Sequence, residues 1–250
     1  MDQKLEEEEL AEGTLLSHLI ELRSRLLIIA ISVVVVFICM LPFSRDIFTV
    51  ISDPLREVLP GNAMIATAVA SPLLTPFKLT FFAALFLVMP IVLFQVWTFI
   101  APGLYKKEKR FAIPLFMTSM LLFYSGIAFA YFVVFPLMFG FFTSVAPEGV
   151  EVQTDIAQFL DFITTIVFAF GIAFEVPVAT VLVVWAGLTD TKKLGKARPY
   201  VFLMAFVAGM FLTPPDIISQ TLLAVPVYLL YELGIIMSKV FVIKEPADNE

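Results

Sequence analysis

Long uncharged apolar stretches alternate with short charged segments along the whole chain. The stretches consist mostly of Leu, Ile, Val, Phe and Ala, and about twenty such residues in a helix cross roughly 30 Å of hydrocarbon. The pattern therefore predicts an all-α polytopic membrane protein with six transmembrane helices in a single membrane domain, 1–250. Their approximate bounds are 24–44, 79–101, 112–138, 162–188, 199–213 and 218–233.

The fifth and sixth predicted helices are short. Uncharged runs of fifteen to seventeen residues rise only roughly 22–26 Å at 1.5 Å per residue, which is less than the hydrocarbon thickness. Local thinning of the bilayer, long flanking side chains or association with partner helices can relieve such a mismatch. Shielding by neighbouring spans of the same chain is the alternative interpretation.

Prolines recur inside four predicted spans, at Pro90, Pro136, Pro177 and Pro226. Each removes a helical hydrogen bond and usually bends the helix. Because bent helices do not close into a regular bundle, we expect a curved, open and concave arrangement. The ordinary frequency of proline in membrane helices would explain one or two of the four.

The orientation follows from the distribution of Lys and Arg. Thirteen of the 16 basic residues lie on one side of the predicted membrane, and only Arg45, Arg56 and Lys78 lie on the other. Basic residues concentrate in cytoplasmic loops, so both termini and the loops 102–111 and 189–198 are predicted to be cytoplasmic. The segment 45–78 is then the first outer loop, and its four prolines favour short helices packed along the outer surface.

Composition excludes several classes of protein. With 60% hydrophobic and only 15% charged residues, the chain is too apolar for a soluble or disordered protein. The net charge is −6, with seven acids among the first twenty-one residues, so no basic face for nucleic acid is expected. Such an acidic start is also unlike a signal peptide. We therefore expect a multi-pass protein of the bacterial cytoplasmic (inner) membrane that inserts through its own spans.

Few residues are available for catalysis. The single Cys39 excludes an internal disulfide, and the single His18 excludes a two-histidine zinc site. The motifs of nucleophilic hydrolases and phosphate-binding loops are absent as well. The sequence therefore predicts no enzyme activity, no metal and no cofactor.

Two cytoplasmic segments carry acids that could bind a cation. In LLSHLIELRSRLL, Glu21 and Arg25 are four residues apart on the polar face of an amphipathic helix, which favours a modest ion pair. In FIAPGLYKKEKR, Glu108 is surrounded by four basic residues and should stay ionised. The plain interpretation of the first segment is an interfacial helix, and that of the second is a topology signal. The functional interpretation is an acidic contact for a cationic ligand.

Glu175 lies near the middle of the fourth predicted span, two residues before Pro177. A charge at that depth costs at least about 2.5 kcal/mol, so such an acid is normally paired, directed inward or protonated. A neutral acid bonded to a carbonyl freed by the proline is the structural interpretation. A functional role is the default for an intramembrane acid.

Four segments together resemble the TatC family, the multispanning receptor subunits of the twin-arginine protein translocase. They occur in the same order and spacing as in that family, over nearly the whole chain. The resemblance implies six spans with cytoplasmic termini, which agrees with the prediction from charge. The segments are HLIELRSRL at 18–26, SPLLTPFKLTFFAALFLVMPIVLFQVWTFIAPGLYKKEKR at 71–110, FGIAFEVPV at 170–178 and FLTPPDIISQTLLAVPVYLLYELG at 211–234.

The resemblance implies a receptor for folded cargo proteins whose signal peptides carry an Arg-Arg pair. Carried over by motif, the binding residues are Glu21 and Glu108, with Arg23 and Phe99 in support. Paired guanidinium groups match carboxylates bidentately, and Lys fits less well. The implied partners are twin-arginine signal peptides, small single-span subunits similar to TatA and TatB, and further copies of the chain in multimeric receptor complexes.

The family's intramembrane acid falls on Glu175. Its outer partner-contact motif falls on Asp216 and Gln220 after a proline pair, and Pro54 matches a position in the first outer loop. The alternative function is a proton-coupled small-molecule secondary transporter that uses Glu175 at its midplane. Such transporters usually carry repeat symmetry with interrupted spans in matching positions, whereas here the unusual spans are adjacent.

Overall fold

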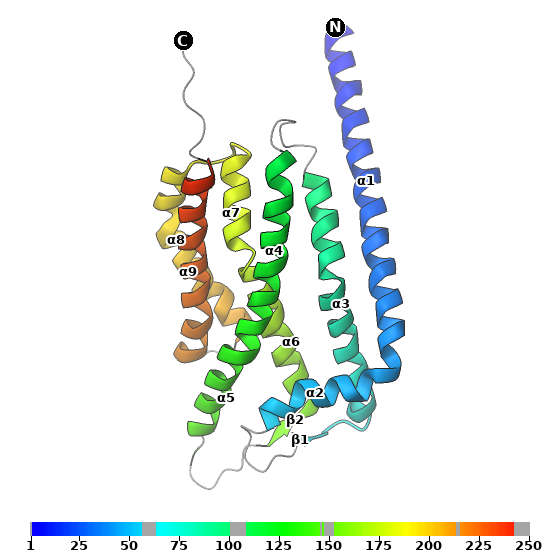
Figure 1. The fold of residues 1–250 in the computed structure, drawn as a ribbon, viewed down its shortest axis with the longest axis vertical. Coiled ribbons are helices and arrows are strands. Elements are labelled where there is room, and N and C mark those ends of the chain that lie inside the picture. Colours follow the sequence, from blue (N-terminus) through cyan, green and yellow to red (C-terminus); the bar gives the residue numbers. More distant parts are fainter. Residues whose placement is uncertain are drawn as a thin grey trace.

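The computed structural model describes residues 2–56, 64–100, 109–145, 147, 153–213 and 216–242, with side chains at 19–52, 64–99, 113–145, 147, 153–213 and 216–240. Helices dominate these residues. The long helices stand side by side, and α2 lies across one end of them (Figure 1). The helices are α1 (Asp2–Met40), α2 (Ser44–Arg56), α3 (Ser71–Ile100), α4 (Lys109–Phe129), α5 (Phe135–Ser144), α6 (Ile156–Ala173), α7 (Val176–Trp185), α8 (Thr191–Leu212) and α9 (Ile217–Val242).

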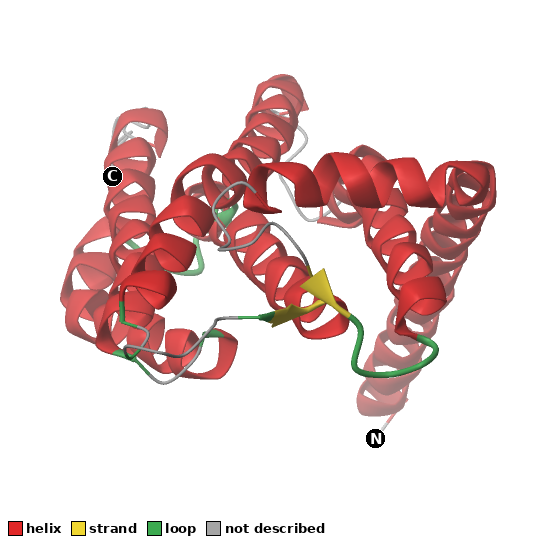
Figure 2. Ribbon diagram, turned by 90° about the horizontal axis from the view of Figure 1, so that it is seen from below, coloured by secondary structure: helices red, strands yellow, loops and turns green. Residues whose placement is uncertain are grey.

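The helices form a curved row. α1 packs on α3, α3 on α4 and α6, α4 on α6, and both α7 and α8 on α9. Figure 2 shows α1 and the end of α9 far apart, at the two ends of this row. Within the described part of α1, only the side chain of Val33 is buried. This arrangement agrees with the predicted curved, open bundle.

Along the direction of the helix axes, the start of α1 and the end of α9 lie at one end of the bundle, and α2 lies at the opposite end (Figure 1). We call the first of these the cytoplasmic end and the second the outer end, following the distribution of Lys and Arg. α1 has 39 residues, which at 1.5 Å per residue is roughly 58 Å. It therefore extends past the other helices at the cytoplasmic end.

Five helical stretches of the described chain are long and apolar enough to cross a membrane: Leu19–Ser52, Ser71–Phe99, Ile113–Ser144, Ile156–Trp185 and Ile217–Val240. The fifth predicted span, 199–213, is not among them; it falls almost entirely in α8, whose first two turns carry three Lys and one Arg. α8 has 22 residues and α9 has 26, so both helices are longer than their uncharged runs. The count of six spans and their exact bounds stay predictions.

Two helical interruptions precede prolines. α6 ends at Ala173 and α7 begins at Val176, with Pro177 in its first turn. A proline has no N–H and its ring collides with the carbonyl four residues earlier, so the fourth predicted span consists of two helices. Between α4 and α5, the π-helical turn η3 (Ala130–Val134) comes before Pro136. Prolines and π-helical turns are the usual causes of bends in helices, so both breaks favour a curved arrangement.

Glycines allow the closest helix contacts. A methyl group on Gly126 of α4 would lie 2.6 Å from the carbonyl oxygen of Phe170 in α6. On Gly234 of α9 it would lie 2.9 Å from Cβ of Thr180 in α7. Both distances are too short for any side chain, and small residues are the usual means of close helix approach in membranes. These contacts fix α4 against α6 and α9 against α7.

A small parallel sheet joins two outer loops. β1 (Met64–Ile65) pairs with β2 (Thr154–Asp155), so the first outer loop is tied to the start of α6. The carboxylate of Asp155 accepts hydrogen bonds from Thr67 N at 2.8 Å and Thr67 Oγ1 at 2.7 Å. Its other oxygen accepts from Ala157 N at 2.9 Å and Gln158 N at 3.2 Å. The hydroxyl of Thr67 is the largest of the causes that lower the pKa of Asp155 to about 2.

We expect Asp155→Asn to lower the thermal unfolding temperature of the purified chain at pH 7. Because folding lowers the pKa of Asp155 from 3.8 to about 2, its contribution to stability is present above the ordinary pKa and is lost as the pH falls toward 2. The difference between wild type and variant should therefore shrink below pH 4. Thermal unfolding at several pH values measures it. Asp161→Asn, which loses only the exposed ion pair with Lys78, should change stability little. A difference independent of pH would contradict the account.

Candidate functional site: a cytoplasmic acidic contact and an intramembrane acid

Glu21 lies on α1 at the cytoplasmic end, where it pairs with Arg25. Nε of Arg25 donates to Oε1 of Glu21 at 3.1 Å, and Nη2 donates to the same oxygen. Oε2 of Glu21 has no hydrogen-bond partner among the described residues. The side chain of Glu21 is 38% exposed and that of Arg25 only 16%. One carboxylate oxygen of Glu21 is thus held inside the protein and the other can accept a hydrogen bond from a ligand.

Arg25 also connects α1 to the end of α3. Nη1 donates to the backbone and side-chain oxygens of Gln95 at 3.4 and 3.3 Å, and Nη2 donates to Thr98 O at 3.3 Å. The last four carbonyls of a helix have no partner within it, and cations are favourable at that end. Thr98 belongs to this last turn, so Arg25 helps to cap α3.

Of the other predicted recognition residues, Phe99 and Arg23 lie within the described part of the chain and Glu108 does not. Phe99 follows Thr98 in the last turn of α3, next to the carbonyl that Arg25 binds. Arg23 is exposed on α1. Glu108 lies outside the described residues, in the segment that joins α3 to α4. The structure thus brings Glu21 to the end of α3, and the position of Glu108 relative to it stays a prediction.

Glu175 occupies the break between α6 and α7. Its side chain is half-buried, and Ser119 Oγ of α4 donates to its Oε2 at 2.6 Å. Oε1 is buried and has no partner within the described chain. The sequence predicts a backbone carbonyl as the structural partner of a neutral acid, but the described partner is a hydroxyl from another helix. A buried oxygen without a partner favours the neutral acid over the carboxylate.

At the outer end, Asp216 caps the start of α9, because its Oδ2 accepts from Ser219 N at 2.7 Å. Oδ1 of Asp216 and Oγ of Ser219 are buried without a described partner. Gln220 follows in the first turn of α9 and lies against Gly209 of α8. Pro54 lies in α2, but its side chain is outside the described residues, as is the proline pair before Asp216.

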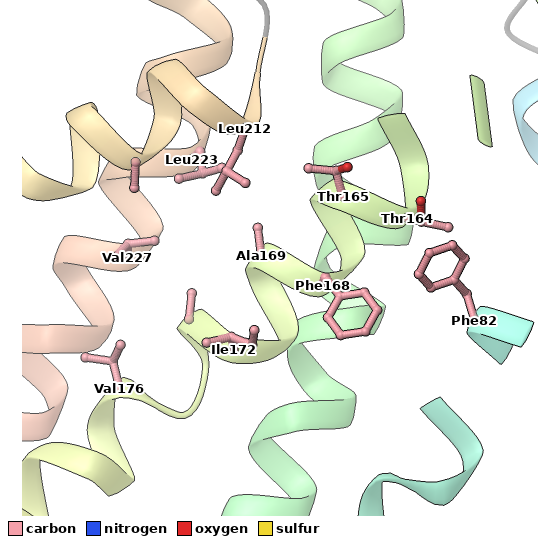
Figure 3. A pocket seen from close by; sticks show the side chains of 12 residues that line it. Phe82, Thr164, Thr165, Phe168, Ala169, Ile172, Val176, Leu212, Leu223 and Val227 are labelled. Atoms are coloured by element: carbon pink, nitrogen blue, oxygen red, sulfur yellow. The ribbon is translucent and has the colours of Figure 1, made fainter. Parts of the chain in front are cut away.

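An apolar cavity of about 520 Å³ opens between α3, α6, α7, α8 and α9. Figure 3 shows Ala169 and Ile172 of α6 facing Leu223 and Val227 of α9 across it. Its two threonines, Thr164 and Thr165, donate their hydroxyls to carbonyls of α6 itself. The cavity therefore suits an apolar occupant. No group of three or more metal-ligating side chains occurs in the part of the chain that the structure describes.

Sequence reasoning did not identify Gln95 or Ser119. Gln95 is one uncharged polar residue in an apolar helix, which is a weak signal for a partner of Arg25. Serines and threonines of membrane helices often bond to their own backbone, as Thr118 and Ser125 do here. Nothing in the sequence distinguishes Ser119 from these neighbours, because its contact depends on how α4 packs against the α6–α7 break.

Comparisons with known proteins agree with one another. The family model for the Sec-independent protein translocase protein (TatC) matches residues 17–226. The Sec-independent protein translocase protein TatC of Azotobacter chroococcum mcd 1 is 61% identical over 222 residues, 88% of this chain and 87% of that protein. The protein of the same name from Escherichia coli (strain K12) is 57% identical over 229 residues, 91% of this chain and 89% of that protein.

The crystal structure of the twin arginine translocase receptor TatC has the same fold. It superposes with a TM-score of 0.80 at 33% sequence identity and covers 90% of this chain and 99% of that chain. The similarity therefore extends over nearly the whole of both molecules, including the open row of helices.

Proposed function

The chain belongs to the TatC family of Sec-independent protein translocase proteins, and from this premise we propose that it is the receptor that binds Arg-Arg signal peptides of folded proteins. As a family member it is a component of protein transport and not an enzyme. It is also a multi-pass protein of the bacterial inner membrane. The signal peptide as ligand and the residues that bind it are the proposal.

The half-exposed carboxylate of Glu21 is the observation that supports this function best. Within the described chain its Oε2 has no hydrogen-bond partner, and Arg25, which binds its Oε1, also binds Thr98 O in the last turn of α3. Hydrogen bonds between a guanidinium and a carboxylate are shorter and stronger than neutral ones. We therefore propose Glu21 as the first arginine contact, with Phe99 and Arg23 in support.

The second acid of the site is Glu108. The segment 101–108 starts where α3 ends, directly after the turn that Arg25 fixes. Because the arginines of the peptide are adjacent, two carboxylates are needed to neutralise them. We assign the second to Glu108, where basic neighbours compete for it and make binding sensitive to salt.

A photo-crosslinking experiment tests this function. With a photoreactive amino acid in place of Leu22, which is exposed beside Glu21, we expect a crosslink to a bound Arg-Arg signal peptide. The same substitution at Val50 on α2, which is exposed at the outer end, should give none. Equal crosslinking from both positions would contradict a cytoplasmic peptide site.

We propose that small single-span partner subunits, similar to TatA and TatB, dock along α8 and α9. We also propose that further copies of the chain join it in multimeric complexes. Only Ala205 and Gly209 are buried in α8, although it carries several large apolar side chains. In lipid, helices associate through packing and hydrogen bonds instead of hydrophobicity. The adjoining apolar cavity supplies a packing surface, and Asp216, Gln220 and Pro54 are proposed contacts at the outer end.

Cysteine crosslinking should map this edge. In a Cys39→Ser background, which removes the only native thiol, we expect crosslinks to a partner helix from Met204→Cys and Val227→Cys. Ile38→Cys on α1 is an exposed control and should crosslink weakly. Crosslinks found only on α1 and α3 would reject the α8–α9 edge.

A further inference from the structure

Arg25 uses all its hydrogen-bonding capacity inside the protein. A guanidinium has five N–H donors, and five hydrogen bonds are described for it: two to Glu21, two to Gln95 and one to Thr98. Its side chain is 16% exposed. Arg25 is thus a mostly buried group, and among the described residues of the proposed peptide site its hydrogen-bond partner is Glu21.

Three of these bonds go to α3, so Arg25 stays anchored even when Glu21 binds something else. Two of their acceptors are backbone carbonyls of Gln95 and Thr98, which no side-chain rotation can remove. The guanidinium therefore has a fixed position from which Nε and Nη2 both contact Oε1 of Glu21. The rotation of the carboxylate is restricted, and Oε2 is the oxygen without a hydrogen-bond partner among the described residues.

We propose that Arg25 is the positioning residue of the signal-peptide site: it holds Glu21 by one oxygen and thereby fixes the other for the incoming arginine. The inference rests on the proposed function and adds the residue that pre-organises it. Holding a binding group in one geometry reduces the entropy lost when the ligand binds. The positive charge next to Glu21 also lowers the attraction for the peptide, so the benefit of Arg25 is geometric.

Lysine cannot replace Arg25 in this role. An ammonium group has three donors on a flexible stem and lacks the planar fork. It can reach Glu21 or the carbonyls of α3, but not all four acceptor oxygens together. Arg25→Lys therefore keeps the positive charge and removes the planar arrangement of donors that holds Glu21.

The test is a double-mutant cycle on the full chain in lipid nanodiscs, with a synthetic Arg-Arg signal peptide as the probe. We expect Arg25→Lys to weaken peptide binding about tenfold in the wild-type background, and less than about twofold in a Glu21→Gln background. Arg45→Lys on α2 is the matched control and should not change the affinity. Thermal unfolding checks that each variant is folded.

Gln95→Met provides a second variant that keeps the side-chain volume and removes one acceptor of Arg25. It should weaken peptide binding about threefold, again only when Glu21 is present. The role of Arg25 would be overturned if each substitution, Arg25→Lys and Gln95→Met, weakened binding by the same factor with and without Glu21. It would also be overturned if neither substitution weakened binding in the wild-type background. Equal affinities of wild type and Glu21→Gln would instead overturn the proposed peptide site, and the role of Arg25 with it.

Discussion

Glu21→Gln should weaken binding of an Arg-Arg signal peptide roughly ten- to a hundredfold. The substitution keeps the shape of the side chain and removes its charge, and a hydrogen bond to a charged group contributes on the order of 1.5–3 kcal/mol. The amide oxygen can still accept from Arg25, so the contact between α1 and α3 should persist. Peptide titrations of the purified chain across a series of salt concentrations measure the effect.

Glu108→Gln should give a loss of similar size, and the loss should diminish at high salt because exposed charges are screened. Asp46→Asn, an exposed acid at the start of α2, serves as the control and should leave peptide binding unchanged. An unchanged affinity in both Gln variants would contradict the assignment of the two acids.

Glu175→Ala should abolish most transport and leave peptide binding within about twofold of wild type, since the two sites are separate. Alanine leaves Ser119 without its partner and removes the polar group from the break between α6 and α7. We propose that this group contacts a partner helix or the signal peptide after binding. Transport into membrane vesicles and partner crosslinking from Val227→Cys, measured on the same variant, separate this later step from recognition.

Glu175→Gln is the matched control. The amide oxygen still accepts from Ser119 and the amide nitrogen supplies a donor, so a neutral acid is closely imitated and transport should be nearly normal. If Gln were as damaging as Ala, the carboxylate itself would be required. That result would favour proton-coupled chemistry of the kind expected for a secondary transporter.

The sequence predicted those features in which a single residue type is energetically costly in a given environment, such as a charge in hydrocarbon or a proline inside a helix. Charged residues are costly in hydrocarbon and are therefore largely excluded from the membrane-spanning segments. The long uncharged runs between them consequently locate the helices. The same cost identified Glu175 as a special residue, and the missing N–H of Pro177 predicted the bend beside it. Each of these effects acts through the residue itself or its immediate neighbours in the chain.

Contacts between distant segments could not be predicted in this way. The two-residue strands β1 and β2 are too short for any alternating pattern, so the link from Asp155 to Thr67 leaves no signal in the sequence. The bond from Ser119 to Glu175 depends on the close packing of α4 on α6 at Gly126. Arg25 was predicted to pair with Glu21 from their spacing, but its bonds to α3 follow only from the packing of α1.

The most direct test is to compare the affinities of an Arg-Arg signal peptide and its Lys-Lys counterpart for the purified chain in nanodiscs, without any partner subunit. A receptor that pairs guanidinium groups with Glu21 and Glu108 should bind the Arg-Arg peptide saturably and at least about tenfold more tightly, because lysine lacks the planar fork. Equal affinities for the two peptides would contradict the account.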